Sequence, residues 1–177
     1  MVAKSTTERA GTAVPAAGEP AGGPRFTYAS PVYFDELDPW RTLHNARYAI
    51  HVERANLAWY AHVSKRDFAP EEDPDQFVFV RDWHAEFTAP MFGPGTMWID
   101  IWLERLGRSS STYAFSCRNE DETVEYARGR KTIVKVDPRT ASPVPWTDRL
   151  REAVASERAR AAADARPLDD AARATDG

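Results

Sequence analysis

One segment constrains the fold more than any other: residues 45–63 contain neither proline nor glycine and predict a single long helix. Arg47, His51 and Arg54 form a narrow polar side of this helix. The apolar residues form two neighbouring stripes at helical spacing: Ala46, Ile50, Leu57 and Tyr60, and then Tyr48, Val52, Ala55 and Trp59. At about 100° per residue, the stripes merge into an apolar arc wider than half the circumference. A helix on a flat sheet needs a narrower stripe, so we expect other elements to wrap around this one.

The rest of the central sequence predicts strands, because apolar and polar side chains alternate between short turns rich in Pro, Gly, Asn or Asp. We expect one strand before the helix and four after it, at residues 26–34, 77–87, 97–104, 112–118 and 124–136. Gly129 is expected to mark a bulge or bend in the last strand. Strands joined by hairpin turns form an antiparallel sheet, and one helix on a curled antiparallel sheet is an α+β architecture.

The two ends of the chain differ in composition from its middle. Residues 1–24 are mostly Ala, Gly, Pro, Thr and charged residues, which bury too little apolar surface to order a chain, so we expect disorder there. Residues 25–150 are expected to form one domain, in which Pro143 and Pro145 end the ordered body. Residues 151–177 are expected to be a charged tail rich in Ala and Arg, which from about Ser156 could form a frayed helix with little to pack against.

The composition also excludes several partners and sites. A formal net charge of -4 argues against nucleic acid as the main partner, and no run is apolar enough to span a membrane. The N-terminal sequence lacks the apolar region of a secretory signal, so we expect a cytoplasmic protein, with its one cysteine, Cys117, inside a strand. The four histidines are His44, His51, His62 and His84, and they lack the spacing and companion residues of a metal site. The sequence contains no glycine-rich phosphate loop and no Gly-x-Ser-x-Gly motif.

Asp38 is the strongest candidate for chemistry. It closes an acidic cluster after the first predicted strand, and Pro39 then turns the chain toward the start of the helix. The amides at a helix N-terminus carry about half a positive charge, which stabilises an oxyanion. An ionised aspartate beside them supplies a nucleophile or a base, which is what acyl transfer or hydrolysis requires. Position alone also fits an ordinary cap or turn carboxylate.

This region resembles the signature of the hotdog-fold acyl-CoA thioesterases, in particular the group around 4-hydroxybenzoyl-CoA thioesterase. The matching residues are Glu36 and Asp38, then His44, Asn45, Ala46, Arg47 and Tyr48, and then Glu53, Arg54 and Ala55. Segments 90–95, 105–110, 134–137 and 143–145 also resemble the family, so the resemblance covers roughly residues 26–150. It implies a hotdog fold, in which the sheet curls around the central helix. It also implies a homodimer or homotetramer with active sites at subunit interfaces.

The resemblance further implies an enzyme that hydrolyses an acyl-CoA thioester to a carboxylic acid and free coenzyme A, with no cofactor besides the coenzyme A of its substrate. Asp38 matches the catalytic carboxylate of the family, which either attacks the thioester carbonyl or activates water. The backbone amide of Asn45 matches the amide that polarises this carbonyl. Glu53 matches a glutamate on the central helix and is expected to support the site.

Other residues are expected to contact the substrate, namely Arg41, Thr42, Tyr48, Arg108, Ser109 and Ser110. Candidates for contacts with phosphate groups also include Arg128, Arg130 and Lys131, although a solvated strand face explains them equally well. Arg41 and Thr42 depart from the family, which has glycine followed by histidine or an apolar residue. Because a non-glycine residue resists a positive φ, we expect the loop to differ at this point.

Two other functions stay open. A thioesterase that acts on an acyl-carrier protein uses the same chemistry with a different docking surface. A non-catalytic acyl-binding or scaffold protein keeps the fold without the activity, and the replacement at Arg41 and Thr42 supports this alternative. A hotdog hydratase is disfavoured, because the sequence lacks the Asp/His motif expected of one.

Overall fold

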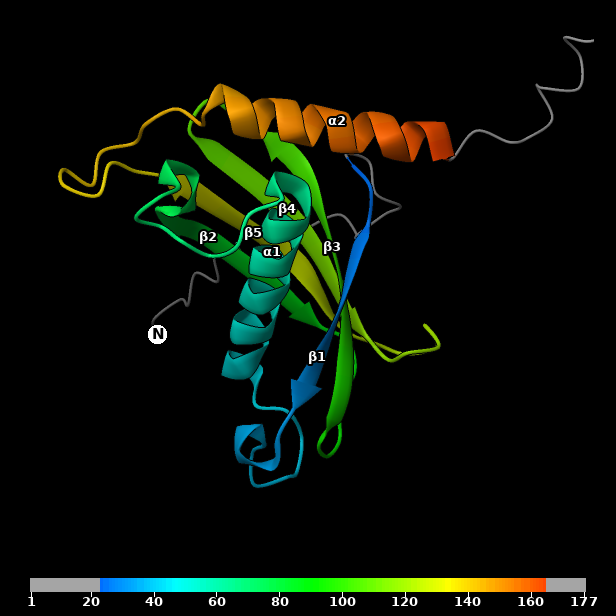
Figure 1. The fold of residues 1–177 in the computed structure, drawn as a ribbon. Coiled ribbons are helices and arrows are strands. Elements are labelled where there is room, and N and C mark those ends of the chain that lie inside the picture. Colours follow the sequence, from blue (N-terminus) through cyan, green and yellow to red (C-terminus); the bar gives the residue numbers. More distant parts are fainter. Residues whose placement is uncertain (1–22, 165–177) are drawn as a thin grey trace, which may run out of the picture.

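The computed structural model of the chain describes residues 23–164. Nearly all of the segment predicted to be disordered, residues 1–24, and the end of the predicted tail, residues 165–177, lie outside the described residues. In the described part, one long helix crosses the concave face of a single sheet, and a second helix lies over one end of that sheet (Figure 1). The site discussed below lies at the opposite end, where the long helix begins.

Five strands form one antiparallel sheet in the order β1-β3-β4-β5-β2. The strands are β1 (Phe26–Val32), β2 (Val78–Phe87), β3 (Gly95–Leu106), β4 (Ser110–Arg118) and β5 (Glu125–Lys135). Short turns join β3 to β4 and β4 to β5, whereas β1 and β2 form the two edges of the sheet. The predicted antiparallel sheet is therefore confirmed, with small differences at the strand ends.

Gly129 has a different role from the predicted bulge, because the pairing of β5 with both neighbours continues through it without a shift in register. A Cβ atom at this position would lie 2.0 Å from the carbonyl oxygen of His84 and 2.8 Å from Cζ of Phe115. Glycine is needed here because the β2 backbone and the Phe115 ring approach β5 so closely.

The long helix is α1 (Tyr48–Ser64), which a 3-10 turn, η2 (Asn45–Arg47), precedes. One of its two predicted apolar stripes is buried against the sheet, together with a further valine: Tyr48, Val52, Ala55, Trp59 and Val63. The stripe meets the inward side chains of the central strands, among them Met97, Ile99, Ile101 and Phe115. The sheet curls around this helix (Figure 1), so the predicted α+β hotdog fold is confirmed.

The other apolar stripe of α1 is not covered within one chain. Because α1 packs mainly on β3 and β1, its far side and the edge strand β2 are left open. Ile50 and Leu57 on α1 are 39% and 45% exposed, and Phe79 and Val80 on β2 are 51% and 53% exposed. The same position buries His51 completely. His51 does lie on one side of the helix with Arg54, whose Nη1 is 3.5 Å from His51 Nδ1, as predicted, but its burial was not predicted.

A second helix, α2 (Asp148–Asp164), follows Pro143 and Pro145, so the prediction that these prolines end the ordered body is wrong. This helix crosses the end of the sheet (Figure 1) and buries Leu150 and Val154 beneath it. The two residues lie one helical turn apart and therefore face the same way. Beyond Ser156, where little packing was expected, Glu157 Oε1 lies 3.0 Å from His62 Nε2, and Nη2 of Arg158 donates a hydrogen bond to the Leu103 carbonyl oxygen at 3.1 Å.

Two buried carboxylates attach α2 to the rest of the fold. Asp73 accepts hydrogen bonds from the Tyr60 hydroxyl at 2.6 Å and from Nη2 of Arg149 at 2.7 Å. Asp75 accepts a hydrogen bond from Nζ of Lys135 at 2.7 Å. These bonds join the turn before β2 to α1, β5 and α2.

The Asp73 carboxylate predicts a specific acid sensitivity. Burial alone would raise its pKa, but the hydrogen bonds from Tyr60 and Arg149 outweigh burial and hold the pKa below its ordinary value. Such a carboxyl contributes stability above its unfolded-state pKa of about 3.9, and this contribution is lost as the pH falls through the folded-state value. We expect the free energy of unfolding to fall more steeply below about pH 4 in the wild type than in Asp73→Asn, measured by urea unfolding at a series of pH values. Equal pH slopes for the two proteins would contradict this role.

Candidate functional site

Asp38 lies in a short loop between β1 and η2 that folds back on itself. The Asp38 amide donates a hydrogen bond to the Thr42 carbonyl oxygen at 2.8 Å, and the His44 amide donates one to the Glu36 carbonyl oxygen at 3.0 Å. These two bonds run across the loop like the rungs of a small hairpin. They bring Asp38 near the start of the helix.

The Asp38 carboxylate is held by donors from its own loop. Its Oδ1 accepts hydrogen bonds from the Trp40 amide at 2.9 Å and the Thr42 amide at 3.0 Å, and its Oδ2 accepts one from the Thr42 hydroxyl at 2.8 Å. The Thr42 amide is the largest cause of a lowered pKa at Asp38; partial burial opposes it, while the Thr42 hydroxyl and the Trp40 amide add to it. A carboxylate has about four acceptor positions, so Asp38 is ionised at neutral pH and keeps one position unused.

Arg41 takes the left-handed conformation, with φ at 64°, despite its side chain. Arg41 therefore adopts the positive φ that a non-glycine residue was expected to resist. The conformation costs roughly 1–2 kcal/mol for an L-residue. The Arg41 carbonyl oxygen accepts a hydrogen bond from the Gly93 amide at 2.9 Å, and Thr42 pairs with Phe92. Contacts with the segment between β2 and β3 thus hold the loop in this shape.

The start of the helix supplies the second predicted group. In η2, the amide of Ala46 donates to Oδ1 of Asn45 at 3.0 Å and to Nδ1 of His44 at 3.2 Å, and the Arg47 amide donates to the His44 carbonyl oxygen at 2.8 Å. Among residues 23–164, no group accepts a hydrogen bond from the Asn45 amide. The predicted polarising amide is therefore available to a ligand.

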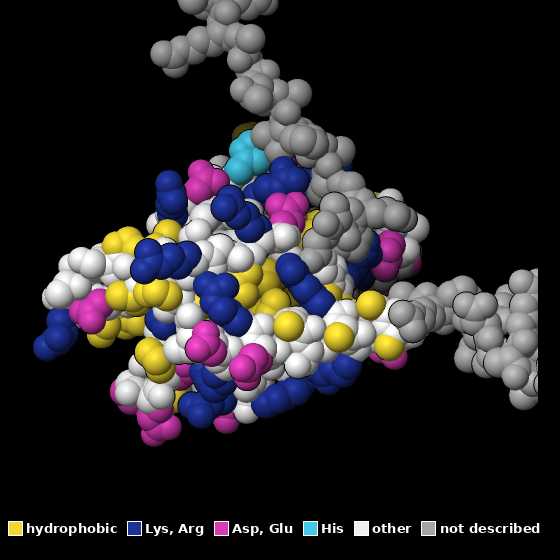
Figure 2. Space-filling view, turned by 90° about the horizontal axis from the view of Figure 1, so that it is seen from above, with side chains coloured by type: hydrophobic (Ala, Val, Ile, Leu, Met, Phe, Trp, Pro, Cys, Tyr) yellow, Lys and Arg dark blue, Asp and Glu magenta, His cyan; other side chains and the backbone are white. Residues whose placement is uncertain are grey.

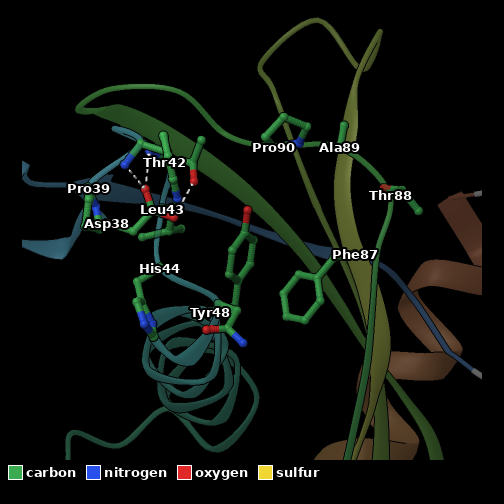
Figure 3. A pocket seen from close by; sticks show the side chains of 12 residues that line it. Asp38, Pro39, Thr42, Leu43, His44, Tyr48, Phe87, Thr88, Ala89 and Pro90 are labelled. Carbon is green, nitrogen blue, oxygen red and sulfur yellow. Dashed lines mark hydrogen bonds between the residues drawn. The ribbon is translucent and has the colours of Figure 1, made fainter.

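A pocket of about 510 Å³ lies between this loop, the start of the helix and the segment after β2 (Figure 3). Its lining residues are Asp38, Pro39, Trp40, Thr42, Leu43, His44, Asn45, Tyr48, Phe87, Thr88, Ala89 and Pro90. Four of the residues predicted for the site therefore meet here: Asp38, Thr42, Asn45 and Tyr48. The pocket is open to solvent on one side and has both polar and apolar walls.

Tyr48 and Phe87 form the inner wall of this pocket. Their rings pack edge to face with centroids 5.1 Å apart, and the Tyr48 hydroxyl points away from the helix toward the loop that carries Asp38 (Figure 3). Burial raises the pKa of the Tyr48 hydroxyl, so it stays protonated and can act as a hydrogen-bond donor. An acyl group in the pocket would therefore meet an aromatic wall with one polar end.

Glu53 does not join this pocket. Its side chain is 58% exposed on the open side of α1 and lies 3.2 Å from Nζ of Lys131, which is buried. The Glu53 carboxylate is thus placed beside the exposed stripe of α1, away from Asp38. The supporting role of Glu53 stays a prediction, because the fold of this chain alone does not place Glu53 beside the other predicted site residues.

The predicted contacts Arg108, Ser109 and Ser110 lie at the other end of the sheet, the first two in the turn between β3 and β4 and Ser110 at the start of β4. There the Arg108 carbonyl oxygen accepts a hydrogen bond from the Trp146 amide at 3.0 Å, and the Ser109 carbonyl oxygen accepts one from the Lys135 amide at 2.8 Å. In this subunit these backbone groups support the approach to α2. Their side chains are not brought to the pocket beside Asp38.

The three other cations considered for phosphate binding each have a carboxylate partner. Arg128 pairs with Glu86 at 3.2 Å and Arg130 with Glu104 at 2.8 Å, while Lys131 pairs with Glu53 as described above. The registers of β2 and β5 place Arg128 and Arg130 on the face of the sheet opposite α1. Their positive charges are therefore balanced, and neither arginine faces the pocket.

Sequence reasoning missed two parts of the site. It did not identify Phe87, Thr88 and Ala89 as pocket walls, because only the pairing of β2 with β5 brings the end of β2 beside the helix start. It also missed the buried side chain of His51, which contacts Glu36 in the loop. The sequence signal for the pocket walls was Phe87, the aromatic residue that ends the predicted strand just before Pro90.

Comparison with known proteins finds similarity to thioesterases. The sequence profile of the Thioesterase superfamily matches residues 41–126, which run from the loop after Asp38 into β5. A comparison with curated proteins finds none that matches. Among solved structures, a DHNA-CoA thioesterase from Staphylococcus aureus is similar with a TM-score of 0.68 and 18% identity, over 81% of this chain and 97% of that one.

Two further solved structures are similar. A thioesterase from Thermus thermophilus, in complex with coenzyme A and zinc, gives a TM-score of 0.63 and 20% identity over 80% of this chain and 96% of that one. A 1,4-dihydroxy-2-naphthoyl-CoA thioesterase from Synechocystis gives a TM-score of 0.64 and 11% identity over 75% of this chain and 96% of that one. At these identities, the likeness shows a shared fold.

Two absences concern the described residues alone. None of the helices within residues 23–164 is long and apolar enough to cross a membrane. In the same range, no three His, Cys, Asp or Glu side chains are grouped so that they could hold a metal ion. The cytoplasmic location stays a prediction.

Proposed function

We propose that the chain, which matches the sequence profile of the Thioesterase superfamily over residues 41–126, hydrolyses an acyl-CoA thioester to a carboxylic acid and free coenzyme A. The observation that carries the proposal is a pair of complementary groups on one pocket, the ionised Asp38 carboxylate and the unused Asn45 amide. The first supplies a nucleophile or base, and the second donates a hydrogen bond to the oxyanion. Coenzyme A as part of the substrate is supported by its presence in the similar thioesterase structure from Thermus thermophilus. The reaction as proposed uses no further cofactor.

In the first of two routes, an Asp38 carboxylate oxygen attacks the thioester carbonyl carbon. The carbonyl oxygen becomes an oxyanion that the Asn45 amide stabilises, and the carbon–sulfur bond then breaks to release coenzyme A as a thiolate, which takes a proton from water. The acyl group is left on Asp38 as an anhydride. A water molecule hydrolyses this anhydride, which releases the carboxylic acid and restores the Asp38 carboxylate.

In the second route, Asp38 takes a proton from a water molecule as that water attacks the thioester carbon, and the same amide stabilises the oxyanion. The proton then passes to the departing coenzyme A thiolate. The lowered pKa of Asp38 makes its carboxylate a weak proton acceptor, because a general base works best with a pKa near the working pH. In both routes Thr42 acts by orienting the carboxylate rather than by touching the substrate.

The test is thiol release from a panel of acyl-CoAs and one acyl-carrier protein, with short, long, branched and aromatic acyl groups. We expect wild-type turnover on at least one acyl-CoA, and a fall of at least about 1000-fold in kcat for Asp38→Asn, because the carboxylate that attacks or activates water is removed. Asp35→Asn is the matched control, since Asp35 is an exposed member of the same acidic cluster and does not line the pocket. Its turnover should equal that of the wild type.

The outcomes separate the alternatives. Equal losses in Asp35→Asn and Asp38→Asn, or full activity in a folded Asp38→Asn, would contradict the role of Asp38. Turnover on the carrier protein alone would identify that substrate class instead. Binding of acyl-CoA without any turnover would indicate a non-catalytic acyl-binding protein.

The acid limb of the pH–rate profile gives a second readout of the same carboxylate. Activity requires ionised Asp38, so it should fall only as the pH drops through the lowered pKa of this group, below about pH 4. Thr42→Val removes the hydroxyl that bonds Oδ2 and thereby raises the pKa. We expect its acid limb to move to higher pH. An identical limb in both proteins would show that another group controls this part of the profile.

We also propose that the working unit contains two copies of the chain that pack through α1 and β2. The exposed apolar residues Ile50, Leu57, Phe79 and Val80 lie on the uncovered side of α1 and on the adjacent edge strand. An edge strand presents unpaired backbone groups that a second copy of the same strand can satisfy. The open end of β2 also leads to Phe87, which is 50% exposed and lines the pocket. A second copy on this face would therefore close the pocket.

Size-exclusion chromatography with light scattering tests this interface. We expect wild-type protein to have at least twice the mass of one chain, and Leu57→Glu to have the mass of one chain because a charge would be buried in the interface. Val124→Glu is the control, because Val124 is 37% exposed on the turn between β4 and β5 and belongs to neither α1 nor β2. A single-chain mass for the wild type, or an unchanged mass for Leu57→Glu, would rule out this interface.

A further inference from the structure

Three buried polar side chains connect β1 and α1 to the loop that carries Asp38. Ser30 on β1 and His51 on α1 have no exposed surface, and Glu36 in the loop is 7% exposed. Ser30 Oγ lies 2.7 Å from His51 Nδ1, and Glu36 Oε1 lies 3.2 Å from His51 Nε2. His51 therefore bridges a strand of the sheet and the first part of the loop.

The surroundings of His51 determine where its proton lies. The guanidinium of Arg54 can only donate, and it lies 3.5 Å from Nδ1, so Nδ1 acts as an acceptor and takes the hydrogen bond of Ser30. Burial lowers the pKa of the His51 imidazole, although the Glu36 carboxylate acts in the opposite direction. The ring is therefore neutral at neutral pH and carries its proton on Nε2, which lies 3.2 Å from Glu36 Oε1 without the alignment of a hydrogen bond.

Ser30, His51 and Glu36 contact one another in the spatial order of a Ser-His-Glu catalytic triad, but they cannot act as a catalytic triad. Ser30 is completely buried in β1 and does not line the pocket beside Asp38, so its hydroxyl cannot reach a substrate there. Stability alone also does not explain the arrangement, because burying a carboxylate beside a neutral ring costs free energy. The arrangement needs another explanation.

Glu36 provides this explanation, because it accepts hydrogen bonds from both ends of the loop that carries Asp38. Its Oε2 accepts a hydrogen bond from the Tyr33 amide at 2.8 Å, before the loop. Its carbonyl oxygen accepts the His44 amide at 3.0 Å, just before Asn45. Asp38 lies between these two points, only two residues after Glu36. The orientation of Glu36 thus sets how Asp38 lies relative to the start of the helix.

We propose that His51 is a positioning residue that acts through Glu36 to hold Asp38 beside the Asn45 amide. The inference rests on the proposed function, since it concerns the same Asp38 carboxylate. Ser30 fixes one side of the imidazole, and Glu36 takes up the other. A displacement of about 1 Å in a reacting group costs about 100-fold in rate, so loss of the imidazole should be visible in turnover.

The kinetic test compares three variants. In His51→Phe, which fills the same space without polar atoms, we expect kcat to fall by about 100-fold with little change in KM, because no pocket residue is altered. His51→Gln, whose amide can donate to Glu36 and accept from Ser30, should recover most of this loss. Val154→Ala is the control for destabilisation alone, because Val154 is buried beneath α2 at the opposite end of the sheet. It should lower the free energy of unfolding and leave kcat unchanged.

A second readout does not depend on activity. The Asp38 and Thr42 amides form hydrogen bonds within the loop, so their hydrogen-exchange rates report how firmly the loop is held. We expect both rates to rise by about tenfold or more in His51→Phe and to stay unchanged in Val154→Ala. Glu36→Gln, which keeps the shape of Glu36, makes the same test if His51→Phe does not fold.

The two proposals can fail separately. If the wild type turns over no thioester while exchange at Asp38 and Thr42 rises in His51→Phe, the proposed function is wrong and the positioning role is supported. Unchanged exchange and unchanged kcat in a folded His51→Phe would overturn the positioning role, whatever the wild-type activity. A loss of kcat in His51→Phe that Val154→Ala shares at equal destabilisation would overturn it as well.

Discussion

Burial of one apolar stripe of α1 in the concave face of the sheet is the interaction on which the rest of this structure depends. The stripe runs from Tyr48 to Val63, and it meets the inward side chains of β3 and β4 along its length. Each fully buried side chain of this size contributes roughly 1.5–3 kcal/mol, so the helix cannot shift along or rotate on the sheet without large losses. The start of the helix is thereby fixed at one end of the sheet, beside the ends of β1 and β2.

The chemistry of the site follows from this fixed helix start. The Asn45 amide is the first amide of the 3-10 turn η2, and it has no acceptor within residues 23–164. The next two amides of this turn, those of Ala46 and Arg47, donate hydrogen bonds to His44 and Asn45. The loop before the helix places the Asp38 carboxylate on the same pocket as the Asn45 amide. Hydrogen bonds from Trp40 and Thr42 hold the carboxylate and also keep it ionised. The left-handed conformation of Arg41 is the strain that this tight loop contains. On the face seen in Figure 2, at the α2 end of the molecule, basic and acidic side chains are mixed.

The parts that the sequence predicted are those governed by local pattern. The absence of proline and glycine over residues 45–63 and the alternation in the later segments predict α1 and the strands, and closeness in the chain brings Asp38, Thr42, Asn45 and Tyr48 together. What the sequence did not predict depends on contacts between distant segments. His51 looked like part of a polar side because its partner Ser30 is on another element, and only the lean of α1 toward β1 buries it. In α2, only Leu150 and Val154 signalled packing amid alanine and charge. Gly129 was recognised as special, but its reason, the approach of Phe115 and the β2 backbone, is three-dimensional.

The central claim is that Asp38 and the Asn45 amide act on one thioester, and a crystal structure of Asp38→Asn with a bound acyl-CoA tests it most directly. The claim predicts the thioester carbonyl oxygen within about 2.7–3.2 Å of the Asn45 nitrogen, with the carbonyl carbon facing the side chain at position 38. A thioester bound with its carbonyl away from Asn45, for example beside Glu53 and Lys131, would contradict the claim and move the reaction to the open side of α1.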